Sequence, residues 1–299
     1  IPGVTESLWY KTWYNLFETH TPYMFALSTF INVSTLERRV KTLSRAAIRK
    51  EAIERELTLG KAVQDAFFQI PELPKGIAMS YAHRAAEFVS GDILFSHWDK
   101  AASTVTMVLC DVTGHGVQAA LKASICSAMC ASIWEHGQLR PGDDPARRLE
   151  ILHRRVTAYL TKTSGSAEIL TLVGCELNLA SGNVRLYRAN GLFPLVIARR
   201  GVGWDVAIQA HAAEKLESTT VSEDSFVVLF SDGIIDGPRT LKRLVGHLEA
   251  KLQPDLKLTA DELKGVIFSF EGFVETNDDK TLAVLEIRRE ALDAHRRAA

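Results

Sequence analysis

The stretch Thr104-Val-Thr-Met-Val-Leu-Cys-Asp-Val-Thr-Gly-His-Gly-Val-Gln-Ala-Ala120 decides the fold of this 299-residue chain. Residues 104–110 form a short apolar run of the kind that predicts a buried strand. Asp111 follows this run directly, and an apolar helix is predicted over 116–135 after a glycine-rich turn. Side chains at strand ends are held by a rigid sheet, so such positions often carry function.

Three further places in the chain also put Asp at the predicted end of a strand. Asp92 lies in Ser90-Gly91-Asp92, Asp232 follows a strand ending at Phe230, and Asp278 and Asp279 precede a strand starting at Thr281. Strands are predicted over 168–177, 183–189, 195–198, 225–230 and 281–287, and helices over 145–160, 240–252 and 259–273. Hairpins grouped apart from helix pairs indicate an α+β fold.

Carboxylates that are buried together require a compensating positive charge. Hard divalent cations with oxygen ligands supply it, and Mg²⁺ or Mn²⁺ suits carboxylates and water. Two such ions lower the pKa of a bound water and hold a phosphoryl group during its transfer. A single Asp beside Gly is ordinary turn chemistry, so this hypothesis depends on all four positions together. The chain has neither a P-loop lysine motif nor an HExxH motif.

Four segments together carry a family resemblance. They are Phe88-Val-Ser-Gly-Asp92, Asp111-Val-Thr-Gly-His-Gly-Val-Gln-Ala-Ala120, Phe230-Ser-Asp-Gly-Ile234 and Asp278-Asp-Lys-Thr-Leu282. In this order they resemble the PP2C-type phosphatases of the bacterial SpoIIE/RsbU branch, over about residues 57–288. The resemblance implies an αββα sandwich preceded by a long helical linker, and hydrolysis of phosphoserine or phosphothreonine esters on a protein.

The resemblance also implies roles for individual residues. Asp111 would bridge two divalent cations, Mn²⁺ or Mg²⁺, with the carbonyl of Val112 as a further ligand. Asp92, Asp232 and Asp278 would complete the carboxylate set, and Asp279 is the alternative to Asp278. His115 would orient water or phosphate, or else make a structural hydrogen bond. The glycines expected to let the backbone approach the site are Gly91, Gly114, Gly116 and Gly233.

Two departures from the family pattern favour a second hypothesis, a pseudophosphatase that binds a partner without turnover. Many relatives have a second Asp where this chain has Phe95. Many also have His in the segment that reads Ala189-Asn-Gly-Leu-Phe-Pro194 here, at the position of Leu192. An ATP-binding kinase of the anti-sigma type is disfavoured, because Asp111-Val-Thr-Gly114 does not fit the Asp-x-Gly-x-Gly box of such kinases.

Four zones are predicted along the chain: an aromatic, irregular segment (1–33), a regulatory linker helix (34–74), the phosphatase domain (75–288) and a charged tail (289–299). Ser34 or Thr35 is the expected N-cap of the linker helix, and Pro71 and Pro74 are expected to end it. Leu36, Val40, Leu43 and Ala47 have coiled-coil spacing. We therefore expect a homodimer through residues 34–70, controlled by an upstream sensor.

The partner and the compartment are also expectations at this point. The resemblance implies a phosphorylated substrate of the STAS type, as in anti-anti-sigma proteins. A net charge of −1 gives no reason to expect nucleic acid. The four cysteines lack metal-site or disulfide spacing, which indicates a reducing, cytoplasmic location. No apolar run reaches a membrane-spanning length, but the aromatic residues of 1–33 suit either a packed helical surface or a membrane interface.

Overall fold

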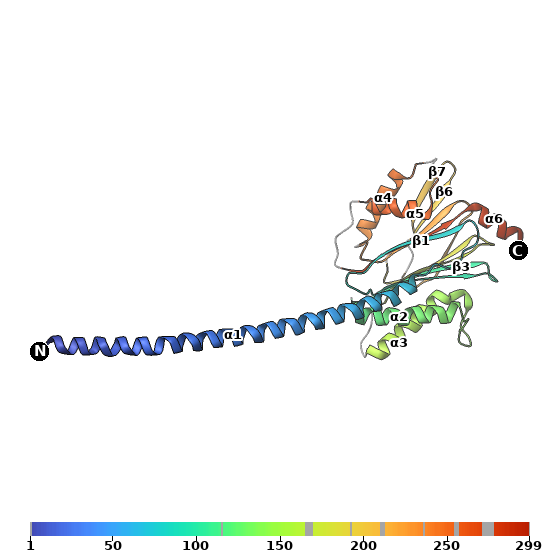
Figure 1. Cartoon of the computed structure of the whole chain (residues 1–299). Coiled ribbons are helices and arrows are strands. Elements are labelled where there is room, and N and C mark those ends of the chain that lie inside the picture. Colours follow the sequence, from blue (N-terminus) through green and yellow to red (C-terminus); the bar gives the residue numbers. More distant parts are fainter. Residues whose placement is uncertain are drawn as a thin grey trace. The chain divides into compact units, whose positions relative to one another are not determined.

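The computed structural model describes residues 2–114, 116–164, 170–191, 193–209, 213–235, 237–253, 257–270 and 278–298, and the side chains from residue 8 onward (Figure 1). The chain divides into two compact units, residues 1–58 and 59–299. The first unit is purely helical and the second contains all the strands.

One helix, α1 (Pro2–Asp65), replaces the irregular segment and the separate linker helix that were predicted. The hydroxyl groups of Ser34 and Thr35 donate hydrogen bonds to the Ile31 carbonyl, at 3.0 and 2.7 Å, so both residues lie inside the helix. Side chains that can cap a helix can also bond back to the preceding turn, and the predicted N-cap was therefore wrong. The helix ends before Pro71, in a 3₁₀ turn, η1 (Ala66–Phe68).

Two five-stranded antiparallel sheets form the centre of the second unit. Sheet A has the order β1 (Ile77–Arg84), β10 (Lys280–Ile287), β9 (Ser225–Phe230), β6 (Leu195–Arg200) and β7 (Gly203–Ile208). Sheet B has the order β2 (Asp92–Asp99), β3 (Thr104–Val112), β4 (Leu170–Asn178), β5 (Asn183–Ala189) and β8 (Glu217–Thr220). A short turn over 179–182 joins β4 to β5.

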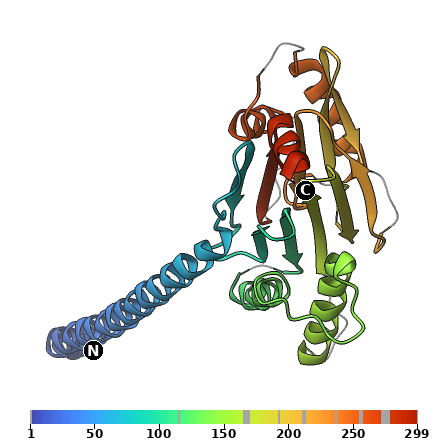
Figure 2. The same ribbon diagram turned by 90° about the vertical axis from the view of Figure 1, so that its right-hand side faces the viewer.

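Helices cover the outer faces of both sheets. They are α2 (Gly116–Trp134), η2 (Pro145–Arg147) and α3 (Arg148–Ser164) on sheet B, and α4 (Pro238–Lys251) and α5 (Ala260–Phe268) on sheet A. A third apolar core fills the space between the sheets and includes Leu292 of α6 (Arg289–Ala298). Figures 1 and 2 show these layers, which confirm the predicted αββα sandwich.

Among the described helices, α2 is long and apolar enough to meet the length and composition test for a membrane span. Its buried side, which includes Ala123, Cys126 and Cys130, packs into the core of sheet B. Core helices of folded domains often pass the same test, so the apolar character of α2 is explained by the sheet it covers.

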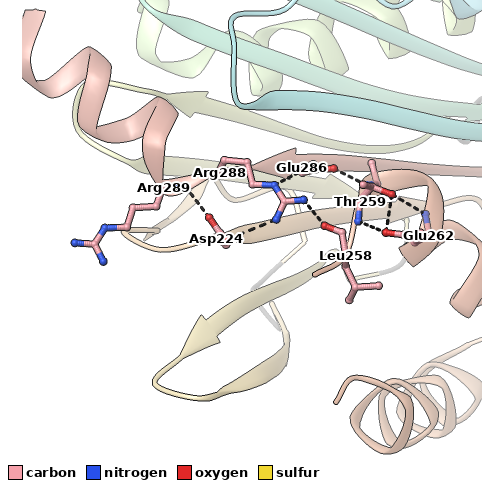
Figure 3. Close-up of polar contacts among 8 residues, drawn as sticks. Asp224, Leu258, Thr259, Glu262, Glu286, Arg288 and Arg289 are labelled. Atoms are coloured by element: carbon pink, nitrogen blue, oxygen red, sulfur yellow. Dashed lines mark hydrogen bonds and ion pairs between the residues drawn. The ribbon is translucent and has the colours of Figure 1, made fainter. Parts of the chain in front are cut away.

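A polar network fixes the end of β10 that lies away from the candidate site (Figure 3). Arg288 pairs with Glu286 at 2.5 Å and with Asp224 at 3.5 Å, and it also donates to the Leu258 carbonyl. The adjacent helix α5 begins with a capping box formed by Thr259 and Glu262. Sheet A is thus joined to α5 and α6 at this end.

Candidate active site

Asp92 and Asp111 are brought side by side by strand register. Asp92 is the first residue of β2, Asp111 is the penultimate residue of β3, and the two are direct partners in the antiparallel ladder. Side chains of paired residues share one face of a sheet. The Asp92 side chain is fully buried and Asp111 is partly buried, so sheet B places two carboxylates together at its edge.

Sheet A supplies the remaining predicted acids at the same end of the sandwich. Asp232 follows β9 and is exposed, and Asp278 and Asp279 precede β10. The Asp111 carboxyl lies close enough to Asp232 and Asp278 for both to act on its pKa. The four predicted strand ends therefore converge in space.

Thr281 of β10 connects the two sheets at this point. Its hydroxyl donates a hydrogen bond to Oδ2 of Asp92 at 2.6 Å. Its backbone N–H donates to Oγ of Ser231 at 2.9 Å, and its carbonyl accepts from the Ser231 N–H at 2.9 Å. Asp92 is thus oriented by a strand of the opposite sheet, and this contact was not predicted from the sequence.

Burial and mutual repulsion strongly raise the pKa values of the buried carboxylates. Burial raises the pKa of Asp92 to about 7, the hydroxyls of Thr281 and Ser231 oppose the shift, and the charges of Asp279 and Asp232 add to it. Burial raises the pKa of Asp111 to about 9, with further contributions from the charges of Asp92 and Asp232. Ionised carboxylates are therefore unfavourable here unless positive charge is added.

The donors present fit a divalent cation. Oδ1 of Asp92 is buried and has no hydrogen-bond partner in the described part of the chain. Among the described residues, none of Asp92, Asp111 and Asp232 forms an ion pair with Lys, Arg or His. Among the same residues, no three His, Cys, Asp or Glu side chains are placed so that they could hold a metal ion as they stand. The carboxylates lie near one another but do not form a compact ligand set, as expected of negative charges that repel one another.

The structure gives Asp278 and Asp279 different environments. Asp279 is only 2% exposed, and its two carboxylate oxygens accept the backbone N–H groups of Ala86 at 2.7 Å and Gly91 at 2.5 Å. Asp278 is exposed, and its Oδ1 accepts the N–H of Asp279 at 2.9 Å. Asp279 therefore holds the loop that leads to Asp92, whereas the Asp278 carboxylate faces outward beside the cluster.

Gln64, near the C-terminal end of α1, holds the same loop from its other side. Its Nε2 donates to the carbonyl of Ser90 at 2.5 Å, and its Oε1 accepts the Ser90 N–H at 2.8 Å. Both residues are buried. This paired contact fixes the backbone two residues before Asp92. No sequence motif indicated it, since a single Gln in a helix gives no signal of its partner.

His83 and Phe68 extend the contacts of Thr281. Nδ1 of His83 lies 2.9 Å from Oγ1 of Thr281, and the Phe68 ring stacks on the imidazole with centroids 4.2 Å apart. Burial lowers the pKa of His83, so the ring is neutral at pH 7. When Asp92 is ionised, it accepts the hydrogen bond from the Thr281 hydroxyl. That hydroxyl has no second hydrogen, so Nδ1 of His83 must be the donor to Thr281.

Two of the predicted glycines are required by close packing. A Cβ on Gly233 would overlap the carbonyl oxygen of Asp279, and a Cβ on Gly91 would lie 2.8 Å from the carbonyl oxygen of Val112. Gly114 and Gly116 instead have positive φ, +102° and +75°, in the turn that leads into α2.

Three other predicted positions have different outcomes. His115 and Leu192 lie outside the described residues. Phe95, which replaces an Asp of many relatives, is buried and packs on Trp134 with ring centroids 5.7 Å apart. It belongs to the core between sheet B and α2, so its place in this chain is structural.

Comparisons with known proteins bear on the family and the fold of this chain. The sequence matches the family described as Stage II sporulation protein E (SpoIIE) over residues 101–288. No curated protein matched the chain. The matched range contains β3, both sheets' central strands and every candidate acid except Asp92.

Solved structures with the same fold include three bacterial proteins. The SiaA-PP2C domain of Pseudomonas aeruginosa has a TM-score of 0.57 and 16% identity, and the match covers 80% of this chain and 98% of that one. The PP2C phosphatase domain of SpoIIE from Bacillus subtilis, with a regulatory-domain fragment, gives 0.51 and 19%, over 71% and 62% of the two chains. The RsbU and RsbW domains of Rv1364c from Mycobacterium tuberculosis give 0.50 and 18%, over 71% and 62%.

Proposed function

Because this chain belongs to the SpoIIE family, which it matches over residues 101–288, we propose that it is a metal-dependent serine/threonine phosphoprotein phosphatase. The observation that carries the proposal is the carboxylate cluster. Four acids from both sheets meet here, Asp92, Asp111 and Asp232 form no ion pair with a basic side chain among the described residues, and the buried Oδ1 of Asp92 has no donor there. Such a set is stable in its ionised form only when cations are present.

The residues proposed to hold the cations follow from these contacts. Asp111 lies between Asp92 of its own sheet and Asp232 of the other, which suits a bridging ligand. Asp92, Asp232, Asp278 and the carbonyl of Val112 are the other proposed ligands. Asp279 is not among them, because backbone N–H groups occupy both of its oxygens. Two bound cations, Mn²⁺ or Mg²⁺, would lower the pKa of the attacking water and neutralise phosphoryl charge.

The chain's own residues prepare this site. Thr281 occupies Oδ2 of Asp92 and so leaves Oδ1 for a ligand. Asp279 and Gln64 fix the loop that sets the position of Asp92. No cysteine is a candidate nucleophile, since all four are buried and burial contributes to raised thiol pKa values at Cys110, Cys126 and Cys175. The reaction assigned to the site is therefore direct attack of water on the phosphate ester.

Hydrolysis of para-nitrophenyl phosphate with and without millimolar Mn²⁺ tests this proposal. We expect metal-dependent turnover in the natural chain and its loss in the Asp111→Asn variant, which keeps the size of the side chain. Circular dichroism of the variant checks that the fold is kept. Equal turnover by the two proteins would refute the assignment of Asp111.

A binding-only function is the second candidate, and Phe95 is the observation that favours it. This side chain fills core volume against Trp134 and cannot hold a metal or a water. A pseudophosphatase would bind Mn²⁺ in a calorimetric titration but would release no phosphate from phosphoserine peptides. Phosphate release that requires Mn²⁺ would exclude this candidate.

The proposed substrate is a phosphoserine-bearing partner of the STAS type, and the proposed control comes from an upstream sensor. The support for control is the contact between Gln64 of α1 and Ser90, which joins the linker helix to the loop before Asp92. Phosphate release from phosphorylated STAS domains and from unrelated phosphoproteins, compared at equal concentration, measures the preference. Equal rates would contradict the STAS assignment.

We also propose that the chain forms a homodimer through residues 34–70. Its proposed location is the cytoplasm, beside a membrane. Leu36, Val40 and Leu43 are 57–70% exposed on the described helix, as a free dimer seam would be. Trp9, Trp13 and other aromatic residues of 8–33 are also exposed. Sedimentation of the chain with lipid vesicles tests the membrane part, and a chain found only in the supernatant would refute it.

A further inference from the structure

A cavity of about 630 Å³ lies between α2 and α3, separate from the carboxylate cluster. Its apolar lining includes Met129 and Ile133 of α2 and Tyr159 of α3. Met129 is thirteen residues from Gly116, where α2 begins beside the candidate site. At 1.5 Å per helical residue this is a distance of about 20 Å along the helix, so the cavity is a distinct site.

Four cationic side chains line this cavity: Arg140, Arg154, Arg155 and Lys162. Asp143 neutralises part of their charge, because its oxygens pair with Arg154 at 2.9 Å and with Arg155 at 2.6 Å. Its Oδ2 also accepts the backbone N–H of Arg140 at 3.0 Å. One carboxylate thus faces four cations, which leaves three positive charges uncompensated in the lining.

Two of the four cationic side chains are available to a ligand. Within the described residues, neither the Arg140 guanidinium nor the Lys162 ammonium has an ion pair. Nε of Arg155 is buried and has no hydrogen-bond partner among the same residues, although Nη1 and Nη2 are bonded to Gln138 and Asp143. Because Nε of Arg155 is shielded from solvent, the groups available to an anion in the cavity are the exposed side chains of Arg140 and Lys162.

We propose that this cavity binds a phosphorylated organic molecule of nucleotide size, such as a nucleoside diphosphate. Guanidinium groups match the geometry of phosphate oxygens. The uncompensated charge suits a ligand with two or three negative charges, and the volume lies within the usual range for small-molecule sites. The apolar lining residues Met129, Ile133 and Tyr159 would contact the uncharged part of the ligand.

Calorimetric titration of the full chain in EDTA, with ADP, inorganic pyrophosphate and adenosine as probes, tests the proposal. EDTA removes divalent cations, so the carboxylate cluster cannot bind phosphate through them and the outcome is independent of the proposed phosphatase activity. We expect ADP to bind more tightly than pyrophosphate, because only ADP has an uncharged part that can contact the apolar lining residues. Adenosine should bind at least tenfold more weakly than ADP.

The decisive variant is Arg140→Ala/Lys162→Ala, since both side chains are exposed and their loss should not affect folding. We expect it to weaken ADP binding at least tenfold. The matched control, Arg239→Ala/Lys242→Ala, removes one Arg and one Lys from the exposed face of α4 and should leave the affinity unchanged. Absence of ADP binding at millimolar concentration, or equal loss in both variants, would overturn the proposal. Tighter binding of hexaglutamate than of ADP would also overturn it and would assign the cavity to an acidic protein segment.

Discussion

At the scale of single residues, the ionised forms of Asp111 and Asp92 are unfavourable in the metal-free protein. Their pKa values of about 9 and about 7 lie far above the ordinary value of 3.8. The folded chain therefore keeps protons that the unfolded chain releases as the pH rises above 4. The stabilising contribution is complete below pH 4 and is lost as the pH rises through 7 to 9.

We expect the metal-free chain to lose stability between pH 5 and 9, and Asp111→Asn to reduce this loss by at least about 1 kcal/mol, since one pKa unit corresponds to about 1.4 kcal/mol. Urea unfolding in EDTA at several pH values measures how the free energy of unfolding of each protein changes with pH. Addition of Mn²⁺ should stabilise the natural chain most at high pH, because the ionised carboxylates are the ligands. A natural chain equally stable at pH 5 and 9 in EDTA would contradict the pKa assignments.

Thr281 is the residue whose hydroxyl links the sheets. Its replacement in Thr281→Val keeps the shape of the side chain but removes the donor to Asp92 and the acceptor for His83. Loss of a contact that orients a ligand typically weakens metal affinity by about 10- to 100-fold, and we expect this effect here. Thr281→Ser should restore the affinity. Calorimetric titrations measure the Mn²⁺ affinity of the three proteins. An unchanged affinity in Thr281→Val would show that Thr281 does not orient Asp92 for metal binding.

At the scale of elements, the turn after β9 depends on Gly233. A side chain there would overlap the Asp279 carbonyl, so Gly233→Ala should destabilise the protein by roughly 3 kcal/mol. The matched control is Gly246→Ala in the exposed interior of α4, where no atom lies within 4 Å of the added methyl. That change should stabilise by about 0.5–1 kcal/mol. Thermal unfolding measures both, and a stable Gly233→Ala protein would show that the turn can move.

The end of α1 should influence the site through Gln64. Gln64→Leu leaves the buried N–H and carbonyl of Ser90 without partners, which typically costs about 1–3 kcal/mol. We expect a looser loop before Asp92, and hence a lower turnover rate at saturating Mn²⁺. Gln69→Leu is the control, because that side chain is exposed and belongs to the same segment. If both variants keep full turnover, the helix end does not position the loop.

The elements that were predicted correctly are those with a strong local pattern. The run 104–110 and the segment 225–230 are buried on both faces and are mostly apolar. The strands β1 and β2 were missed because polar residues interrupt both, and β7 and β8 because they are short edge strands. Helix α6 was read as a charged tail, although Ala291 and Leu292 are buried.

The candidate site shows the same division between local and long-range information. The four acidic positions could be found because each lies beside a glycine or a strand end in the sequence. The partners of Asp92 and Ser90, which are Thr281 and Gln64, are separated from them by 189 and 26 residues. Only the fold brings these groups together. The same holds for the separate environments of Asp278 and Asp279, which are adjacent in the chain.

At the scale of the whole molecule, the linker is expected to set the oligomeric state. Leu36, Val40, Leu43 and Ala47 occupy alternating spacings of four and three on α1. We expect the full chain to have twice its 33.1 kDa mass in light scattering, and Leu36→Glu/Leu43→Glu to have the single mass. Arg38→Glu/Arg45→Glu alters residues on the opposite side of this spacing and should remain a dimer. A natural chain of single mass would refute the dimer.

The Thr281–Asp92 contact has a further consequence for how the two sheets come apart. It joins the first residue of β2 to β10, which belong to different sheets. A cation bound between Asp111 and Asp232 would add a second connection between the sheets at the same end. Opening of either sheet would then require release of the ion, so the two sheets would exchange their amide hydrogens as a single cooperative unit. In deuterated water, we expect Mn²⁺ to slow exchange in β3 and β9 together, including amides far from the site.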